Sequence, residues 1–180
     1  RYDLNIVKHW QKITEKRNEI EGHVLNLKYF QYLSLLFTEL YLDQYFHHQA
    51  DMLNELNVEL EQYNHDQKSD AEQFQQYLPE DLNKIGYWNA TGSGKTLLMH
   101  VNILQYLDYF QNQNGDSTYP DQIILLTPNE GLSEQHLQEL TDSGFQATLF
   151  DKQKSRNSLY RDEIQIIDMN KLSDTDGDKT

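Results

Sequence analysis

The chain has 180 residues, of which 37% are hydrophobic and 24% charged, a composition that is typical of a globular fold rather than of a disordered chain. Its formal net charge of −14 disfavours a general nucleic-acid scavenger, because contact with phosphates requires local positive charge. The lack of cysteine excludes a disulfide framework and thiolate metal sites. We expect a cytoplasmic protein without membrane contact, since no apolar run approaches the ~18 residues that a membrane span requires.

The N-terminal part of the chain has the spacing of amphipathic helices. Apolar residues recur every three or four positions at Ile6, Trp10, Ile13 and Ile20. Gly22 is expected to end this first helix. A second helical pattern covers Lys28 to about Tyr63, either as one long helix or as two helices joined near His48.

A polar, acidic stretch follows this pattern. The segment from Glu39 to Asn83 contains eleven acidic residues and a single base, Lys68, so any contact with nucleic acid should avoid it. A solvated helical face and a docking surface for a partner subunit both explain such a composition. Ser69 is predicted to cap a short helix that reaches Leu78 and ends before Pro79.

From Lys84 onwards the pattern alternates between strands and helices. Strands are predicted at Ile85–Trp88, Gln122–Thr127, Gln146–Phe150 and Glu163–Ile167, with helices at Lys95–Phe110 and Gly131–Leu140. This order favours an α/β fold, a mostly parallel sheet with helices on its faces. We therefore expect two parts, a helical region of residues 1–83 with the acidic stretch, and a partial phosphate-loop domain of residues 84–180.

The segment Asn89–Thr96 matches the phosphate-loop pattern at every position except the first, where asparagine replaces glycine. Gly92 and Gly94 allow the tight bend that brings several backbone N–H groups onto one anion. The residues predicted to bind the nucleotide phosphates are Ala90, Thr91, Gly92, Ser93, Gly94, Lys95 and Thr96. Of these, Lys95 and Thr96 are the predicted catalytic pair, because the ammonium group reaches the outer phosphates and the hydroxyl is placed to ligate Mg²⁺. The expected ligands are thus ATP and Mg²⁺.

Two segments carry a resemblance to a known family. Residues Trp88–Leu97 resemble motif I of superfamily 2 helicases and translocases, and Ile123–Asn129, followed by Leu132–Gln135, resembles motif Ia. The resemblance implies an incomplete RecA-like sheet. It also implies contact between duplex DNA and residues Thr127–Gln135, through the Thr127 hydroxyl and the start of the following helix.

A third segment, Leu27–Gln31, resembles the aromatic-glutamine segment that reads adenine in many of these proteins. The amide of Gln31 can both donate and accept hydrogen bonds, which suits recognition of an adenine edge. About 60 residues separate Gln31 from Lys95, so this resemblance makes Glu39–Asn83 an insertion. The alternative is a glutamine on a helix surface beside core aromatic residues.

The amino-acid sequence of these motifs is most similar to that of the helicase-type subunits of restriction and phage-defence systems, in which ATP hydrolysis drives movement along duplex DNA. This similarity implies partner subunits of a restriction-like complex. The family takes its Mg²⁺-binding acids from an Asp-Glu pair after a buried strand, and no apolar strand here ends in that pair. We therefore expect a fragment that is incomplete for catalysis, with the acidic pair beyond residue 180.

Alternative hypotheses remain open at this point. Asp168 follows an apolar strand and would be the Mg²⁺-site acid of a phosphate-loop kinase or signalling NTPase. In another alternative, the chain is a non-enzymatic module that nucleotide only stabilises. The bases Lys152, Lys154, Arg156 and Arg161 fit either a DNA contact or a solvated loop.

Overall fold

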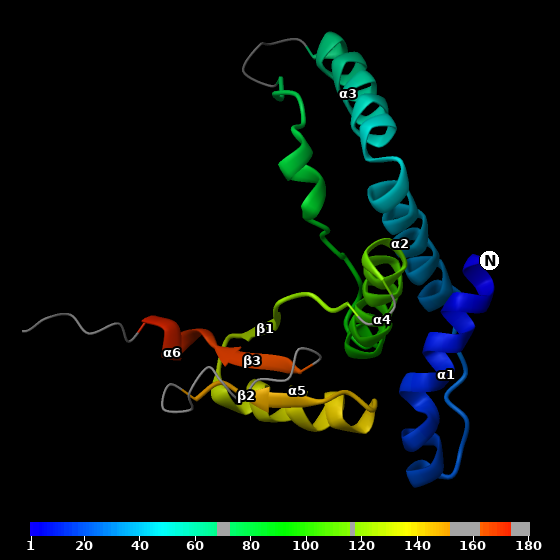
Figure 1. The fold of residues 1–180 in the computed structure, drawn as a ribbon, viewed down its shortest axis with the longest axis vertical. Helices are drawn as coiled ribbons and strands as arrows, with labels where there is room; N and C mark the ends of the chain where they lie inside the picture. The colour runs from blue at the N-terminus through cyan, green and yellow to red at the C-terminus, as the bar shows by residue number, and fades with distance from the viewer. Residues whose placement is uncertain (68–72, 116–117, 152–162, 174–180) are drawn as a thin grey trace, which may run out of the picture.

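The computed structural model describes residues 1–67, 73–115, 118–151 and 163–173. Its elements are α1 (Tyr2–Glu21), α2 (Tyr29–His47), α3 (Gln49–Asp66), the 3-10 helix η2 (Pro79–Asn83), α4 (Lys95–Asn114), β1 (Ile123–Thr127), α5 (Glu130–Asp142), β2 (Ala147–Leu149), β3 (Ile164–Asp168) and α6 (Met169–Ser173). Figure 1 shows α1, α2 and α4 grouped together, the sheet with α5 to one side, and α3 extending away from both. The predicted α/β fold, a helical lead followed by an incomplete RecA-like sheet, is confirmed.

The sheet has three parallel strands in the order β1-β3-β2, so β1 lies at one edge. In its register Thr127 pairs with Asp168, the last residues of β1 and β3. Helix α5 covers one face of this sheet through Leu140, which is fully buried against Ile164 and Ile166. Burial on that face accounts for the apolar residues that point toward α5, whereas Ile124 and Leu126 of β1, which alternate with them, are 47% and 52% exposed.

A second core joins the N-terminal helices to α4. Its buried members are Ile6, Trp10, Ile13, Leu35, Leu98, Val101 and Leu104. Each such side chain stabilises the fold by about 1.5–3 kcal/mol through its removal from water. The predicted apolar stripe of the first helix is therefore confirmed for Ile6, Trp10 and Ile13, but not for Ile20, which is 69% exposed. Gly22 ends that helix in the left-handed conformation, with φ of 68°. The second helical pattern forms two helices, which meet at His48.

Two sequence predictions are wrong. Residues 85–88 do not form a strand: within the described part of the chain they pair with no other strand, and Trp88 is fully exposed. A strand needs a hydrogen-bonded neighbour, and none of the described strands lies beside this segment. The helix expected up to Leu78 is also absent from residues 73–78, which form neither helix nor strand, and Pro79 begins η2 instead of ending a helix. Its expected cap, Ser69, lies outside the described residues.

A buried carboxylate connects the three core helices. Glu39 of α2 is fully buried, and its Oε1 accepts hydrogen bonds from Gln105 of α4 at 3.0 Å and from Asn5 of α1 at 3.4 Å. Its Oε2 accepts a hydrogen bond from the Tyr109 hydroxyl at 3.0 Å. Burial and the neighbouring Glu39 raise the pKa of Tyr109, so the phenol stays protonated and remains a donor. These bonds fix α4 against α2 at a position remote from the phosphate loop.

Helix α4 also contacts the end of α5 through a buried histidine. The Nδ1 of His100 lies 2.8 Å from the Ser143 hydroxyl, and burial lowers the pKa of His100 from 6.5 to about 4.

Among the described helices, none is long and apolar enough to cross a lipid bilayer.

The low pKa of His100 predicts a stability change in acid. Above pH 6.5 the imidazole is neutral in both states; between pH 6.5 and 4 only the unfolded chain binds the proton, so stability falls as the pH falls. The loss amounts to about 3 kcal/mol at pH 4. Urea unfolding across this window should show a steeper decline for the wild type than for His100→Gln. Parallel declines would contradict the assignment.

Candidate nucleotide-binding site

The loop of residues 89–94 connects an extended segment to the first turn of α4. Gly92 and Gly94 have φ of 77° and 80°, in the left-handed region that favours glycine. The backbone N–H of Ser93 donates to the Ala90 carbonyl at 3.2 Å, and Gly94 is the N-cap of α4. The chain therefore turns sharply and presents the N-terminus of a 20-residue helix, the arrangement that attracts anions.

The Lys95 side chain folds back over this loop. Its Nζ donates to the carbonyl oxygens of Ala90 at 3.0 Å and Asn89 at 3.3 Å, although the residue as a whole is exposed. The loop therefore curls around the ammonium group, which lies at the mouth of the bend rather than in bulk water. A phosphate that entered there would meet a cation already in place.

The sequence allows two roles for Gln31, adenine recognition or a place on a helix surface, and the structure places its side chain against the loop. Its Nε2 donates to the Ser93 carbonyl at 2.9 Å, and its Oε1 accepts a hydrogen bond from the Lys28 backbone at 3.0 Å. The side chain is 6% exposed, so it is not a surface glutamine. The start of α2 is thereby fastened to the phosphate loop, a contact that no sequence pattern predicted.

The approach of Gln31 explains why Gly94 has no room for a side chain. A Cβ added at Gly94 would lie 2.7 Å from the Gln31 Nε2, whereas a Cβ added at Gly92 would meet nothing within 4 Å. Both positions have positive φ, so alanine at either one carries the backbone cost of about 1–2 kcal/mol. Only at Gly94 must the amide also move and break its bond to Ser93.

Gly94→Ala is therefore expected to lower the free energy of unfolding by about 1 kcal/mol more than Gly92→Ala, the matched control. Urea unfolding of both variants measures the difference. In the Gln31→Ala background the excess cost of Gly94→Ala should disappear, because the obstructing amide is gone. Equal costs in the two backgrounds would show that Gln31 does not restrict the loop.

Two hydroxyl groups of the motif differ in their surroundings. The Ser93 hydroxyl oxygen is buried and has no hydrogen-bond partner among the described residues. A buried hydroxyl without a partner costs about 1–3 kcal/mol, so this atom favours a ligand that brings hydrogen-bonding groups into the loop. Thr96, on the first turn of α4, lines the groove next to Lys95. The loop residues thus fit a phosphate chain, and the Thr96 hydroxyl fits a hard cation such as Mg²⁺.

A groove of 760 Å³ extends from the loop between α4 and the edge of the sheet. Lys95 and Thr96 lie among its lining residues, and apolar side chains make up most of the rest, among them Met99, Ile103 and Tyr106 of α4 and Ile123 and Ile124 of β1. Ile124 is 47% exposed, although it belongs to a strand of the sheet. The groove therefore lies along the open edge of β1.

The segment expected to contact DNA contains both buried and exposed residues. Thr127 is 1% exposed, and its hydroxyl lies 2.6 Å from the Ser133 hydroxyl and donates to the Ile167 carbonyl at 3.3 Å. This hydroxyl is used within the protein, which differs from the expectation that it contacts a phosphate. Asn129 caps α5 by accepting a hydrogen bond from Leu132 N at 2.9 Å. The exposed residues of the segment are Pro128, Asn129, Glu130, Gly131, Glu134 and Gln135.

Asp168 ends the central strand of the sheet. It is 7% exposed, and its Oδ1 accepts a hydrogen bond from the Asn170 backbone at 2.9 Å. The groove that Lys95 and Thr96 line takes its strand residues from β1, and Asp168 is not among its lining residues. The kinase alternative therefore gains no support from this groove. The bases Lys152, Lys154, Arg156 and Arg161 lie outside the described residues.

Comparison with known proteins gives a family. Residues 44–179 match the family described as Type III restriction enzyme, res subunit. The match contains the phosphate loop, α4, the whole sheet and α5, whereas Gln31 and α1 lie before it. No curated protein and no solved structure matches the chain significantly.

Proposed function

Because this chain belongs to the res-subunit family of type III restriction enzymes, a family of helicase-like ATP-binding motors, we propose that it binds ATP and Mg²⁺ at residues 89–96. In the complete motor, hydrolysis of this ATP drives movement on duplex DNA within a cytoplasmic restriction or phage-defence complex. Residues 1–83 form its helical region and residues 84–180 part of its motor domain. The observation that carries the proposal is the bend of the loop around the Lys95 ammonium group.

Each loop residue has a distinct task in this proposal. The backbone N–H groups between Ala90 and Thr96 donate to phosphate oxygens, aided by the positive end of α4. Lys95 exchanges its two carbonyl acceptors for phosphate oxygens and neutralises the charge that develops on the outer phosphate. The Thr96 hydroxyl would hold Mg²⁺, which when bound would supply further charge neutralisation.

Gln31 is proposed to read the adenine base. One proton of its Nε2 is used by Ser93, which leaves the second proton and a lone pair of Oε1 for the base. Because the same side chain holds the loop, base recognition and phosphate binding would be linked through one amide.

Hydrolysis also requires carboxylates that hold Mg²⁺ and orient water. We propose that they come with a further strand that pairs with the open edge of β1. A strand parallel to β1 would bond to the backbone of this edge and lie beside the apolar groove. Its carboxyl end would lie at the same edge of the sheet as the ends of β1 and β3, where a βα site binds ligands.

Duplex DNA is proposed to lie across the start of α5. Pro128, Asn129, Glu130 and Gly131, before and at the start of this helix, are exposed, and the helix N-terminus favours a phosphate group. The buried hydroxyl of Thr127 then acts indirectly, since its bond to Ser133 holds the first turn of α5 against the end of β1.

A matched pair of substitutions tests the DNA surface. Gln135 and Gln138 are both exposed on α5, and each donates to an acid four residues later, at 3.1 Å and 3.0 Å. Glutamate at either position therefore adds the same charge and breaks the same kind of bond, but only Gln135 lies in the proposed DNA segment. Gln135→Glu should weaken duplex binding about fivefold, as expected from ~1 kcal/mol of repulsion, and Gln138→Glu should have little effect.

Fluorescence anisotropy with a labelled duplex at low and physiological salt measures both affinities, with and without Mg·ATP. Binding that weakens steeply with salt and tightens with nucleotide supports a DNA motor. Equal losses for the two variants would place the DNA elsewhere. The same chain should bind Mg·ATP without steady turnover, and turnover abolished by Lys95→Ala would show that the acids are already present.

A further inference from the structure

A long arm, formed among the described residues by 49–67 and 73–83, projects from the body of the protein. It consists of α3, the returning segment 73–78 and η2, and Figure 1 shows α3 and the returning segment side by side, away from α1 and the sheet. Helix α3 packs against α2 and η2. Among the described residues of the arm, only Leu60 and Leu82 are buried. The arm therefore has almost no apolar core of its own.

Polar contacts, rather than apolar burial, hold the returning segment on α3. Asn57 and Tyr77 exchange two hydrogen bonds, from the side-chain amide to the Tyr77 carbonyl at 3.1 Å and from the Tyr77 N–H to Oδ1 at 2.7 Å. Asn64 makes the same pair of bonds with the backbone of Phe74, at 2.7 Å and 2.9 Å. Seven residues separate the two asparagines, so both lie on one face of α3. The side chains of Phe74 and Tyr77 are left 63% and 44% exposed.

An apolar stripe runs along the flank of the arm. Met52, Leu56 and Tyr63 lie four and seven residues apart, so they share one side of α3. The ring of Phe74 continues the stripe, with its centroid 5.8 Å from that of Tyr63. Leu56 and Tyr63 are 36% and 49% exposed. Exposed apolar side chains that lie together in this way are typical of a surface that contacts another molecule.

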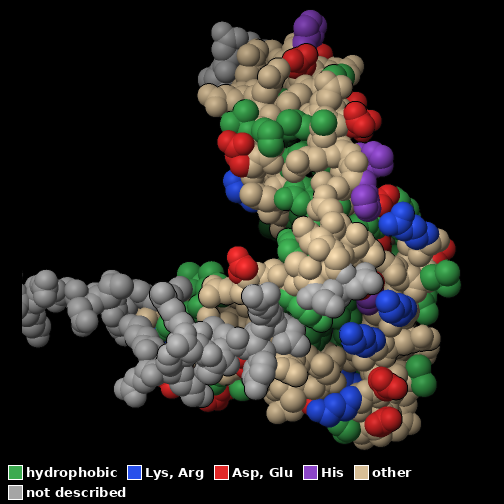
Figure 2. Space-filling model, in the orientation of Figure 1, with side chains coloured by type: hydrophobic (Ala, Val, Ile, Leu, Met, Phe, Trp, Pro, Cys, Tyr) green, Lys and Arg blue, Asp and Glu red, His purple; other side chains and the backbone are tan. Residues whose placement is uncertain are grey.

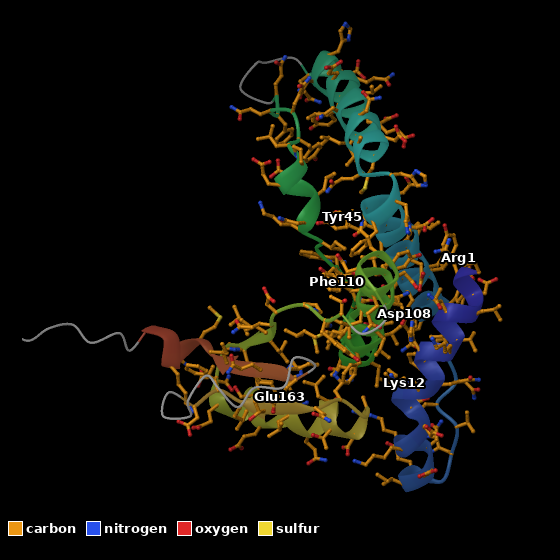
Figure 3. The ribbon with its side chains drawn as sticks, in the orientation of Figure 1. Arg1, Lys12, Tyr45, Asp108, Phe110 and Glu163 are labelled. Atoms are coloured by element: carbon orange, nitrogen blue, oxygen red, sulfur yellow. The ribbon has the colours of Figure 1, made fainter. Side chains whose placement is uncertain are left out.

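Acidic residues border the stripe. Glu55 and Glu59, one turn apart, line a hollow of 410 Å³ together with Met52 and Leu56. The described residues of the arm include seven carboxylates, at Asp51, Glu55, Glu59, Glu61, Asp66, Glu80 and Asp81, and no lysine or arginine. Figure 2 shows acidic and hydrophobic side chains close together along this projection, and Figure 3 shows side chains on its outer faces extending into open space. Such a surface repels nucleic acid and a second copy of itself.

From this combination we propose that the arm docks a basic, amphipathic segment of another protein. The apolar side of such a segment would cover Leu56, Tyr63 and Phe74, while its lysines or arginines would meet Glu55 and Glu59 across the rim. Apolar contact at the centre with complementary charge around it is the composition of a specific protein interface. This inference does not depend on nucleotide or DNA binding.

The experiment uses the full 180-residue chain and a fluorescent synthetic helix of leucine and lysine with one apolar face. Glu55→Lys/Glu59→Lys is compared with Glu15→Lys/Glu19→Lys on α1, an exposed pair with the same spacing and the same change of net charge. Leu56→Ser/Phe74→Ser is compared with Leu4→Ser/Val24→Ser, which also removes two exposed apolar side chains. Anisotropy measures affinity, and hydrogen exchange maps the bound residues.

The two arm variants should each lose about tenfold or more in affinity, because each removes one half of the surface, while both controls stay within about twofold. Protection from exchange should increase over residues 52–63 and 73–78, and Lys95→Ala should bind the peptide as the wild type does. If the arm variants and their control variants lost the same affinity for the peptide, a general change in charge or apolar surface would explain the effect, and the proposal would be overturned. Preference for a leucine-glutamate helix, for duplex DNA or for a second copy of the chain would overturn it as well.

Discussion

Lys95→Ala is expected to weaken Mg·ATP binding by on the order of 50-fold, because each charge-assisted hydrogen bond to a phosphate contributes about 1.5–3 kcal/mol. The ammonium group is the cation that the loop brings to the phosphates, and the carbonyls of Asn89 and Ala90 hold it beside the bend before the nucleotide binds. Isothermal titration of Mg·ATP into both proteins measures the change directly.

Lys84→Ala is the control for this measurement. Lys84 is an exposed lysine just before the loop, and its ion pair with Asp81, at 3.6 Å, lies on the surface. Such a pair contributes less than about 1 kcal/mol, so its removal should leave the affinity almost unchanged. If Lys95→Ala bound Mg·ATP as tightly as the wild type, the loop would not be the nucleotide site and the motor proposal would fail.

The largest expected effect on stability comes from Glu39→Ala. Removal of this buried carboxylate leaves the Tyr109 hydroxyl and the Gln105 amide without their carboxylate acceptor. It also leaves a cavity among α1, α2 and α4. The free energy of unfolding should fall by about 3 kcal/mol or more, since buried polar groups without partners and new cavities both carry a cost. Urea unfolding followed by circular dichroism checks the value.

Two further experiments separate the contributions. Glu59→Ala removes an exposed carboxylate and should change the stability by less than about 0.5 kcal/mol. A double-mutant cycle of Glu39→Gln and Tyr109→Phe should give a coupling of about 1 kcal/mol, because the two side chains share a hydrogen bond. A cost for Glu39→Ala near that of Glu59→Ala would show that the buried network does not hold the helices together.

Local patterns in the sequence predicted most of the fold. The stripe around Trp10, the stop at Gly22 and the apolar run of β1 all depend on residues that are near neighbours along the chain. The strand predicted at residues 85–88 does not form. A strand requires a hydrogen-bonded neighbour, and the local sequence pattern does not reveal whether one is present. The helix predicted up to Leu78 does not form over residues 73–78, because the side-chain amides of Asn57 and Asn64 bond to the backbone of this segment.

The candidate site was predictable only in part. The glycine spacing predicted a sharply bent loop, and Gly92 and Gly94 have the positive φ that such a bend requires. The contact between Gln31 and Ser93 spans 62 positions, and periodicity along the sequence carries no information about such pairs. Family resemblance did direct attention to Gln31. Burial of the Thr127 hydroxyl was not foreseen, because whether a strand-end residue is buried depends on how the next helix packs.

The asparagine contacts on α3 have an evolutionary consequence. Asn57 and Asn64 bond only to main-chain atoms of Tyr77 and Phe74, so they hold the path of this segment whatever side chains it carries. Mutations in residues 73–78 could therefore change which protein is recognised while the scaffold beneath stays the same, provided that proline, which lacks the N–H, does not enter at position 74 or 77. Divergent relatives would then keep the two asparagines and vary the residues that these asparagines hold.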